Sequence, residues 1–170
     1  MIRGGNKLEK NQDTRGHGDG IITAIAFGGF LIIVGLLFVL TPDLWQKITD
    51  FFNSFTTKAV PLGSSTSNVM LPAPADPAAH QVLYNAVMQF DIAFGILQVF
   101  IFGLRMFAHS KTRRLAETLG NAVFWLGSAV LVNVFLLAGT LSGWFEYWAA
   151  IIVLVGVSLI ARAIVHFVKR

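Results

Sequence analysis

Four long apolar runs constrain the fold of this chain more than any other feature of its sequence. A helix rises 1.5 Å per residue, so about 20 apolar residues cross the ~30 Å hydrocarbon core of a bilayer. The runs cover residues 21–40, 82–107, 115–139 and 144–168. The sequence therefore predicts an all-α integral membrane protein, whose four-transmembrane-helix bundle forms a single membrane domain over residues 20–170.

The composition agrees with a location in the membrane. Only 13% of the residues are charged and 55% are hydrophobic, whereas soluble domains have about 25% charged and 45–50% apolar residues. The net charge of +4 is compatible with a nucleic-acid partner. However, most basic residues flank the apolar runs, where they anchor a helix to the membrane. We expect the lipid bilayer as the partner, and no nucleic acid.

Several classes of chemistry have no basis in this sequence. It contains no cysteine, which excludes disulfides, thiolate catalysis and cysteine-based metal sites. The histidines lie in the tail or near the ends of the apolar runs, so a haem held by two histidines within the membrane is not expected. The HExxH, GxSxG and Walker A motifs are absent. We therefore expect no cofactor, no metal and no catalytic residue.

The basic residues predict the orientation of the helices. They cluster before the first run, between the second and third runs, and at the end of the chain. Residues 41–81 contain two lysines, Lys47 and Lys58, and residues 140–143 contain no basic residue. Because basic loops stay in the cytoplasm, we expect a multi-pass protein of the cytoplasmic membrane with both termini inside and residues 41–81 outside.

Three segments outside the runs have distinct patterns. Residues 1–19 are polar and glycine-containing, which predicts a disordered cytoplasmic tail. Residues 42–57 predict an amphipathic helix, which either lies flat on the outer leaflet or packs on the second membrane helix. Residues 60–79 are rich in Pro, Ser, Gly and Ala and predict an extended, mobile connection. At its end, Asp76 and Pro77 suit the N-cap and first position of a helix.

Asp91 is the most informative single residue. It lies in the second run, where a carboxylate costs a few kcal/mol on insertion scales, so its side chain should face protein or water. Tyr84 and Gln98 share its helix face, and Asn133 of the third run is expected at a similar depth. We therefore predict an intramembrane polar site of Asp91, Gln98, Tyr84 and Asn133. It is either an ion or proton path or ligand site, or a hydrogen-bonded contact that joins helices.

Other residues are expected to act at the membrane surfaces. Arg105 and Glu117 flank the inner turn, which predicts an ion pair between them, or between Glu117 and Arg162. Small residues at Ala24 and Gly28 predict a close helix-packing surface that continues to Gly35. The expected lipid headgroup anchors are Lys111, Arg113, Arg114, Trp45, Trp144 and Trp148.

The stretches at residues 90–96 and 122–127 resemble segments of small prokaryotic multispan proteins to which no activity is attached. Four spans with one membrane carboxylate also resemble the small multidrug transporters. That carboxylate is a glutamate of the first helix in those transporters, and they lack the long outer loop. The resemblance is therefore one of architecture alone.

Three functional hypotheses follow. The first is a non-enzymatic accessory subunit or structural membrane component, acting as a homo-oligomer or within a larger membrane complex. The second is a small oligomeric channel or a proton- or cation-coupled transporter that uses Asp91. The third is a membrane enzyme using loop residues such as Asp76 and His80 with a partner.

Overall fold

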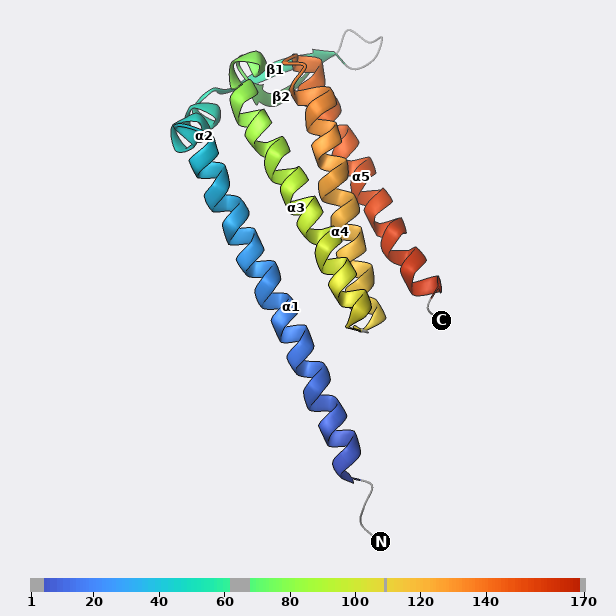
Figure 1. Ribbon diagram of the computed structural model, residues 1–170. Helices are drawn as coiled ribbons and strands as arrows, with labels where there is room; N and C mark the ends of the chain where they lie inside the picture. Colours follow the sequence, from blue (N-terminus) through green and yellow to red (C-terminus); the bar gives the residue numbers. More distant parts are fainter. Residues whose placement is uncertain (1–4, 62–67, 109, 169–170) are drawn as a thin grey trace.

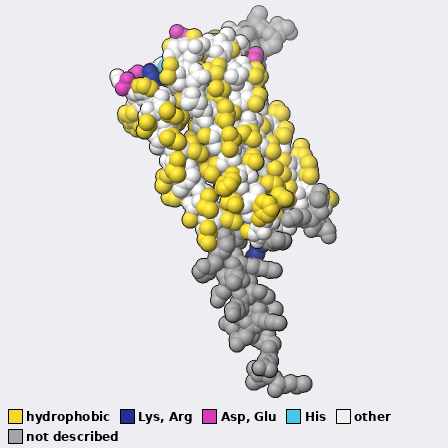
Figure 2. Space-filling model, in the orientation of Figure 1, with side chains coloured by type: hydrophobic (Ala, Val, Ile, Leu, Met, Phe, Trp, Pro, Cys, Tyr) yellow, Lys and Arg dark blue, Asp and Glu magenta, His cyan; other side chains and the backbone are white. Residues whose placement is uncertain are grey.

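Four long helices dominate the computed structural model of the chain, which describes residues 5–61, 68–108 and 110–168 (Figure 1). The helices are α1 (Gly5–Leu40), α3 (Gln81–Phe107), α4 (Thr112–Leu131) and α5 (Leu141–Val168). Each provides a stretch that is long and apolar enough to cross a membrane. The four predicted spans are therefore confirmed as helices of sufficient length and hydrophobicity. Hydrophobic side chains cover much of the flank visible in Figure 2, as such spans require.

The four helices stand in a row in the order α1, α3, α4, α5, and each packs along the next (Figure 1). Small residues bring the neighbours close. The Leu126 side chain of α4 packs directly against Gly95 of α3, and the Leu154 side chain of α5 packs directly against Gly127 of α4. Such close approach is how helices associate in lipid, where no hydrophobic effect drives them together.

Helix α1 packs against α3 through one of its sides. Leu97 of α3 closes on Gly29, and the ring of Phe30 meets the rings of Phe90 and Phe94 edge to face. The predicted packing positions Gly28 and Gly35 are instead open, since an added Cβ at either would meet nothing within 4 Å among the described residues. The apolar flank of α1 is therefore largely uncovered.

The start of α1 differs from the expected disordered tail. The helix begins at Gly5, well before the apolar run, and its N-terminal end projects beyond the other helices (Figure 1). Extending an existing helix needs no new nucleus, and Leu8, Glu9 and Lys10 are good helix formers. These two factors favour helix over coil next to the first span.

A cap of α2 (Leu44–Asn53) and a two-stranded hairpin covers one end of the row, opposite the N-terminal end of α1 and the C-terminal end of α5 (Figure 1). Strand β1 (Phe55–Pro61) pairs antiparallel with β2 (Asn68–Pro74), and Phe55 lies opposite Pro74. The prediction of an all-α fold is therefore wrong in this part. The mobile connection predicted for residues 60–79 is likewise partly a strand. Thr56, Val60 and Val69 suit strands, and their β-branched side chains favour the pairing.

Helix α2 is shorter than the predicted residues 42–57. It begins after Asp43, whose left-handed backbone (φ 55°) ends the approach from α1. It stops before Ser54, whose hydroxyl donates to the carbonyl of Phe51 at 2.7 Å. Its buried face, formed by Leu44, Ile48 and Phe51, packs on Leu83 and Ala86 of α3. Of the two arrangements expected for this helix, the structure therefore contains the packing on α3.

The predicted helix start at Asp76 is confirmed. A carboxylate oxygen of Asp76 accepts a hydrogen bond from the amide of Ala78 at 3.0 Å. Pro77 then opens a short 3-10 helix, η1 (Pro77–His80), that leads directly into α3. This turn fixes where the cap joins the second membrane helix.

The most enclosed core lies where the cap meets the helices. Tyr84 of α3, Trp144 of α5 and Ala73 of β2 are buried there together with Val132 and Leu136. The last two belong to a π-helical turn (Val132–Leu136) that ends α4, in which the amide of Leu137 donates to the carbonyl of Val132 at 3.0 Å. The wider turn changes which side chains of α4 face α3.

Candidate polar site within the helix bundle

Asp91 is buried at the contact between α3 and α4. Its residue surface is 2% exposed, and it lies roughly 15 Å along the helix from Gln81 by helix rise. The hydroxyl of Ser128 in α4 donates to Oδ2 of Asp91 at 2.6 Å. Such a short bond to a carboxyl group is of the strong kind, and it joins two membrane helices.

Tyr147 of α5 lies close to this contact, where its phenol interacts with both Ser128 and Asp91. The hydrogen bond between Asp91 and Ser128 is therefore next to α5 as well as between α3 and α4.

The sequence analysis did not single out Ser128, the partner of Asp91. A lone serine in an apolar run has little weight as a signal. Asn133 was expected to bind Asp91 instead, and this expectation is wrong. The amide of Asn133 contacts Sδ of Met88 at 3.5 Å, about one turn nearer the cap. Asn133 belongs to the π-helical turn, and its exposed position cannot be deduced from regular helix spacing.

The polar face predicted for α3 does face protein. Tyr84 is 2% exposed and Gln98 is 9% exposed. However, the predicted four-residue site is not assembled, because among the described residues Asp91 bonds to Ser128 rather than to Tyr84, Gln98 or Asn133. The Tyr84 hydroxyl is buried beneath the cap, without a hydrogen-bond partner among the described residues.

The predicted inner ion pair is also wrong. Glu117 pairs with Arg113 of its own helix at 3.0 Å, because the i,i+4 spacing brings these two side chains together on the surface of α4. Arg162 donates to the Asn121 side chain at 2.9 Å, and Arg105 donates to Thr118 at 2.5 Å. Both arginines therefore turn toward polar groups of α4 and join neighbouring helices.

The residues expected to anchor lipid headgroups differ in how exposed they are. Trp45 and Trp148 are 68% and 51% exposed, but Trp144 is only 6% exposed. Its indole N–H donates to the carbonyl of Pro72 at 3.3 Å, and its ring packs against Phe51 and Phe55. Trp144 therefore holds the cap onto α5. Lys111 and Arg113 are exposed at the opposite end of the row, as headgroup anchors would be.

The loop residues considered for catalysis have separate structural contacts. Asp76 caps η1, and Nε2 of His80 lies 2.9 Å from the hydroxyl of Ser54. Two cavities lie beside the cap, one lined by aromatic side chains and one lined by residues that include Lys47 and His80, and Asp91 lines neither. Among the described residues, no group of three His, Asp or Glu could hold a metal ion.

Comparison of the chain with known protein families, with curated proteins and with solved structures finds no match. The resemblance of two short segments to small prokaryotic multispan proteins therefore gains no support. Any functional conclusion has to be drawn from the contacts described above.

Proposed function

We propose that this chain is a non-enzymatic accessory or structural component of a membrane, whose buried polar residues hold its helices together. One observation carries the proposal: Asp91 is 2% exposed and accepts the Ser128 hydroxyl between α3 and α4. A carboxylate that served an ion path or a ligand site would border water or a cavity. Here its contacts link neighbouring helices instead.

The other polar side chains of the bundle support the same proposal. Arg105 and Arg162 bind groups of α4, and His80 contacts Ser54. Each of these contacts joins two different elements of the fold. Hydrogen bonds between membrane helices contribute about 0.6 kcal/mol on average, so several are needed to fix one arrangement of the row.

The uncovered side of α1 supports a role as a subunit. Gly28 and Gly35 lie one above the other after two turns, and in the described part of the chain no atom lies within 4 Å of a Cβ added at either. Small residues in an apolar helix let a second helix approach closely. A second copy or a different membrane protein would dock there.

The proposed orientation places the cap outside the cell and both termini in the cytoplasm. The basic residues between α3 and α4 lie at the end of the row opposite the cap, as the positive-inside rule requires for this orientation. Trp45 and Phe52 of α2 are exposed beside the end of α1. We propose that they contact the outer leaflet while the opposite face of α2 packs on α3.

A liposome experiment tests the role of Asp91. Wild type and Asp91→Asn are reconstituted, and proton and cation flux is followed under a pH gradient, while thermal unfolding reports whether both proteins fold. Because an amide oxygen can still accept the Ser128 proton, the variant should remain folded, and neither protein should conduct. Flux through the wild type that the substitution abolishes would instead support the proton- or cation-coupled transporter and overturn this proposal.

A second experiment tests the subunit role. Tagged wild type is purified in a mild detergent beside a double variant, Gly28→Leu with Gly35→Leu, and co-purifying protein is quantified. The double variant should lose its partner, because the leucines fill the space that a second helix would occupy. Gly156→Leu of α5 is the matched control, since Gly156 also faces open space. Equal recovery of the partner with all three proteins would rule out docking on α1.

A further inference from the structure

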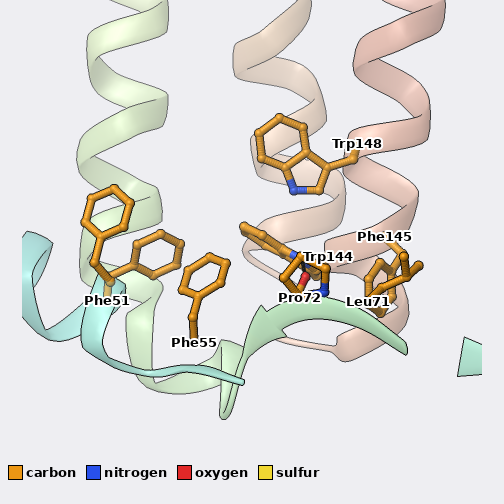
Figure 3. Close-up of a pocket in the computed structure, with 8 residues that line it drawn as sticks. Phe51, Phe55, Leu71, Pro72, Trp144, Phe145 and Trp148 are labelled. Carbon is orange, nitrogen blue, oxygen red and sulfur yellow. Dashed lines mark hydrogen bonds between the residues drawn. The ribbon is translucent and has the colours of Figure 1, made fainter. Parts of the chain in front are cut away.

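An apolar groove of about 570 Å³ opens between the cap and the start of α5. Phe55 and its neighbour Phe52 line one side, Leu71 and Pro72 of β2 line the bottom, and Trp144 and Trp148 line the other side. Figure 3 shows Phe51 and Phe55 facing the two tryptophans across this space, with β2 running beneath them. The groove is distinct from the contact of Asp91 with Ser128.

The lining offers very few hydrogen bonds. The indole N–H of Trp144 is already bonded to the carbonyl of Pro72, proline has no N–H to give, and Leu71 lies opposite Lys58 in the hairpin. A peptide occupant would leave its own N–H and C=O groups unsatisfied, and each would cost several kcal/mol in an apolar site. A hydrocarbon chain has no such groups.

The size of the groove also favours a thin occupant. A helix with its side chains is about 10–12 Å wide and rises 5.4 Å per turn. The groove volume of about 570 Å³ therefore matches roughly one helical turn. It is too small to seat a helix of a partner subunit and is within the ~300–1,000 Å³ of small-molecule sites.

An apolar path connects the groove with the middle of the membrane. Trp148 is 51% exposed at the edge of the groove, followed along α5 by Ile152 (74%), Val155 (42%) and Leu159 (54%). These spacings of four, three and four residues keep the side chains on one face of the helix. This face belongs to a stretch with the length and hydrophobicity of a membrane span. A lipid chain could thus enter the groove without leaving apolar surroundings.

We propose that this groove binds one acyl chain of a membrane lipid from the leaflet next to the cap. The chain lies between Phe55 and Trp148, and the lipid headgroup stays at the level of the cap. The proposal rests on the membrane location of α5 but is independent of the role of Asp91 and of docking on α1.

Photo-crosslinking tests the proposal on the full chain in liposomes. The probe is a phosphatidylcholine with a diazirine in one acyl chain, and mass spectrometry maps the labelled residues. Labelling of Phe55, Leu71 and Trp148 should saturate as the probe fraction rises, because the groove holds one chain. Labelling of Ile152 and Leu159 should rise in proportion to the probe, because bulk lipid reaches them.

A pair of neighbouring substitutions supplies the control. Leu71→Trp fills the groove, whereas Met70→Trp adds the same side chain on the opposite face of β2, since successive strand residues point to opposite sides. Leu71→Trp should lower labelling of Phe55 severalfold and Met70→Trp should leave it unchanged. Circular dichroism and gel filtration establish that both variants fold.

Two results would overturn the proposal: proportional, non-saturating labelling of the groove in the wild type, and crosslinks from the groove to a second copy in place of lipid. The saturation measurement needs no substitution, so it decides the matter even if Leu71→Trp does not fold. Absence of labelling at Ile152 and Leu159 would instead contradict the membrane location of α5, which separates the two proposals.

Discussion

At the scale of single residues, loss of the hydrogen bond from Ser128 to Asp91 should lower the free energy of unfolding more than loss of any other side-chain contact. Ser128→Ala removes the donor and leaves a buried carboxyl oxygen without its partner. Hydrogen bonds between membrane helices contribute about 0.6 kcal/mol on average and up to about 1.7 kcal/mol, and this short bond to a buried carboxyl group should lie near the upper value. The measurement is reversible unfolding in detergent micelles, in which the free energy of unfolding should fall by that amount.

Ser158→Ala is the control for this prediction. Ser158 is also buried, at 4% exposed, but its hydroxyl donates to the carbonyl of Val155 in its own helix at 2.8 Å. Its removal breaks no contact between helices, so the free energy of unfolding should change by less than about 0.5 kcal/mol. Equal losses of unfolding free energy for the two serines would show that the hydrogen bond between Ser128 and Asp91 stabilises the protein no more than a hydrogen bond within one helix.

Residue-scale contacts in this chain were also the hardest to predict from sequence. The burial of Tyr84, Asp91 and Gln98 on one face of α3 follows from helical periodicity, and the structure agrees. The partner of Asp91 does not follow, because it depends on the register of α4 against α3. An error of five residues, about 7.5 Å of helix rise, is enough to replace Ser128 by Asn133. The π-helical turn before residue 137 adds a shift that no local pattern reveals.

At the scale of elements, the turn between α4 and α5 depends on a close backbone approach. A Cβ at Gly143 would collide with the carbonyl oxygen of Phe135, and a backbone atom cannot move aside as a side chain can. Gly143→Ala should therefore lower the free energy of unfolding by about 1–3 kcal/mol through overpacking. Gly156→Ala, in the open part of the same helix, should have almost no effect on thermal unfolding.

The cap should loosen when its attachment to α5 is weakened. Trp144→Phe keeps an aromatic ring but removes the hydrogen bond to the carbonyl of Pro72. Amide hydrogen exchange in β1 and β2 should then become faster, while exchange in the middle of α3 should not change, because the two regions open independently. Trp148→Phe, at a half-exposed ring without that bond, is the comparison, and equal acceleration by both would contradict the proposed attachment.

The elements differ in how far sequence predicts them. The membrane helices follow from run length alone, because a bilayer requires about 20 apolar residues. The hairpin could not be predicted in the same way, since three prolines, Pro61, Pro72 and Pro74, lie within its strands and proline argues against a strand. They are tolerated in a ribbon of two strands, where each strand has one unpaired edge.

At the scale of the whole molecule, the side of the membrane on which the cap lies can be measured directly. The chain has no cysteine, so a single introduced cysteine can be labelled without background. We predict that Thr57→Cys in the cap reacts with a membrane-impermeant maleimide in intact cells. Lys111→Cys, between α3 and α4, should react only after the cells are permeabilised, because basic residues stay on the cytoplasmic side.

Ile152→Cys completes this experiment. Ile152 is 74% exposed on the apolar face of α5, where water would reach it in a soluble protein but lipid excludes water from it in a membrane. A maleimide reacts with the thiolate, which forms in water. The residue should therefore stay unlabelled in intact and permeabilised cells and react only when detergent and denaturant are added. Labelling of Ile152→Cys in permeabilised cells would contradict the membrane span. Reversal of the Thr57→Cys and Lys111→Cys results would keep the span and invert the orientation.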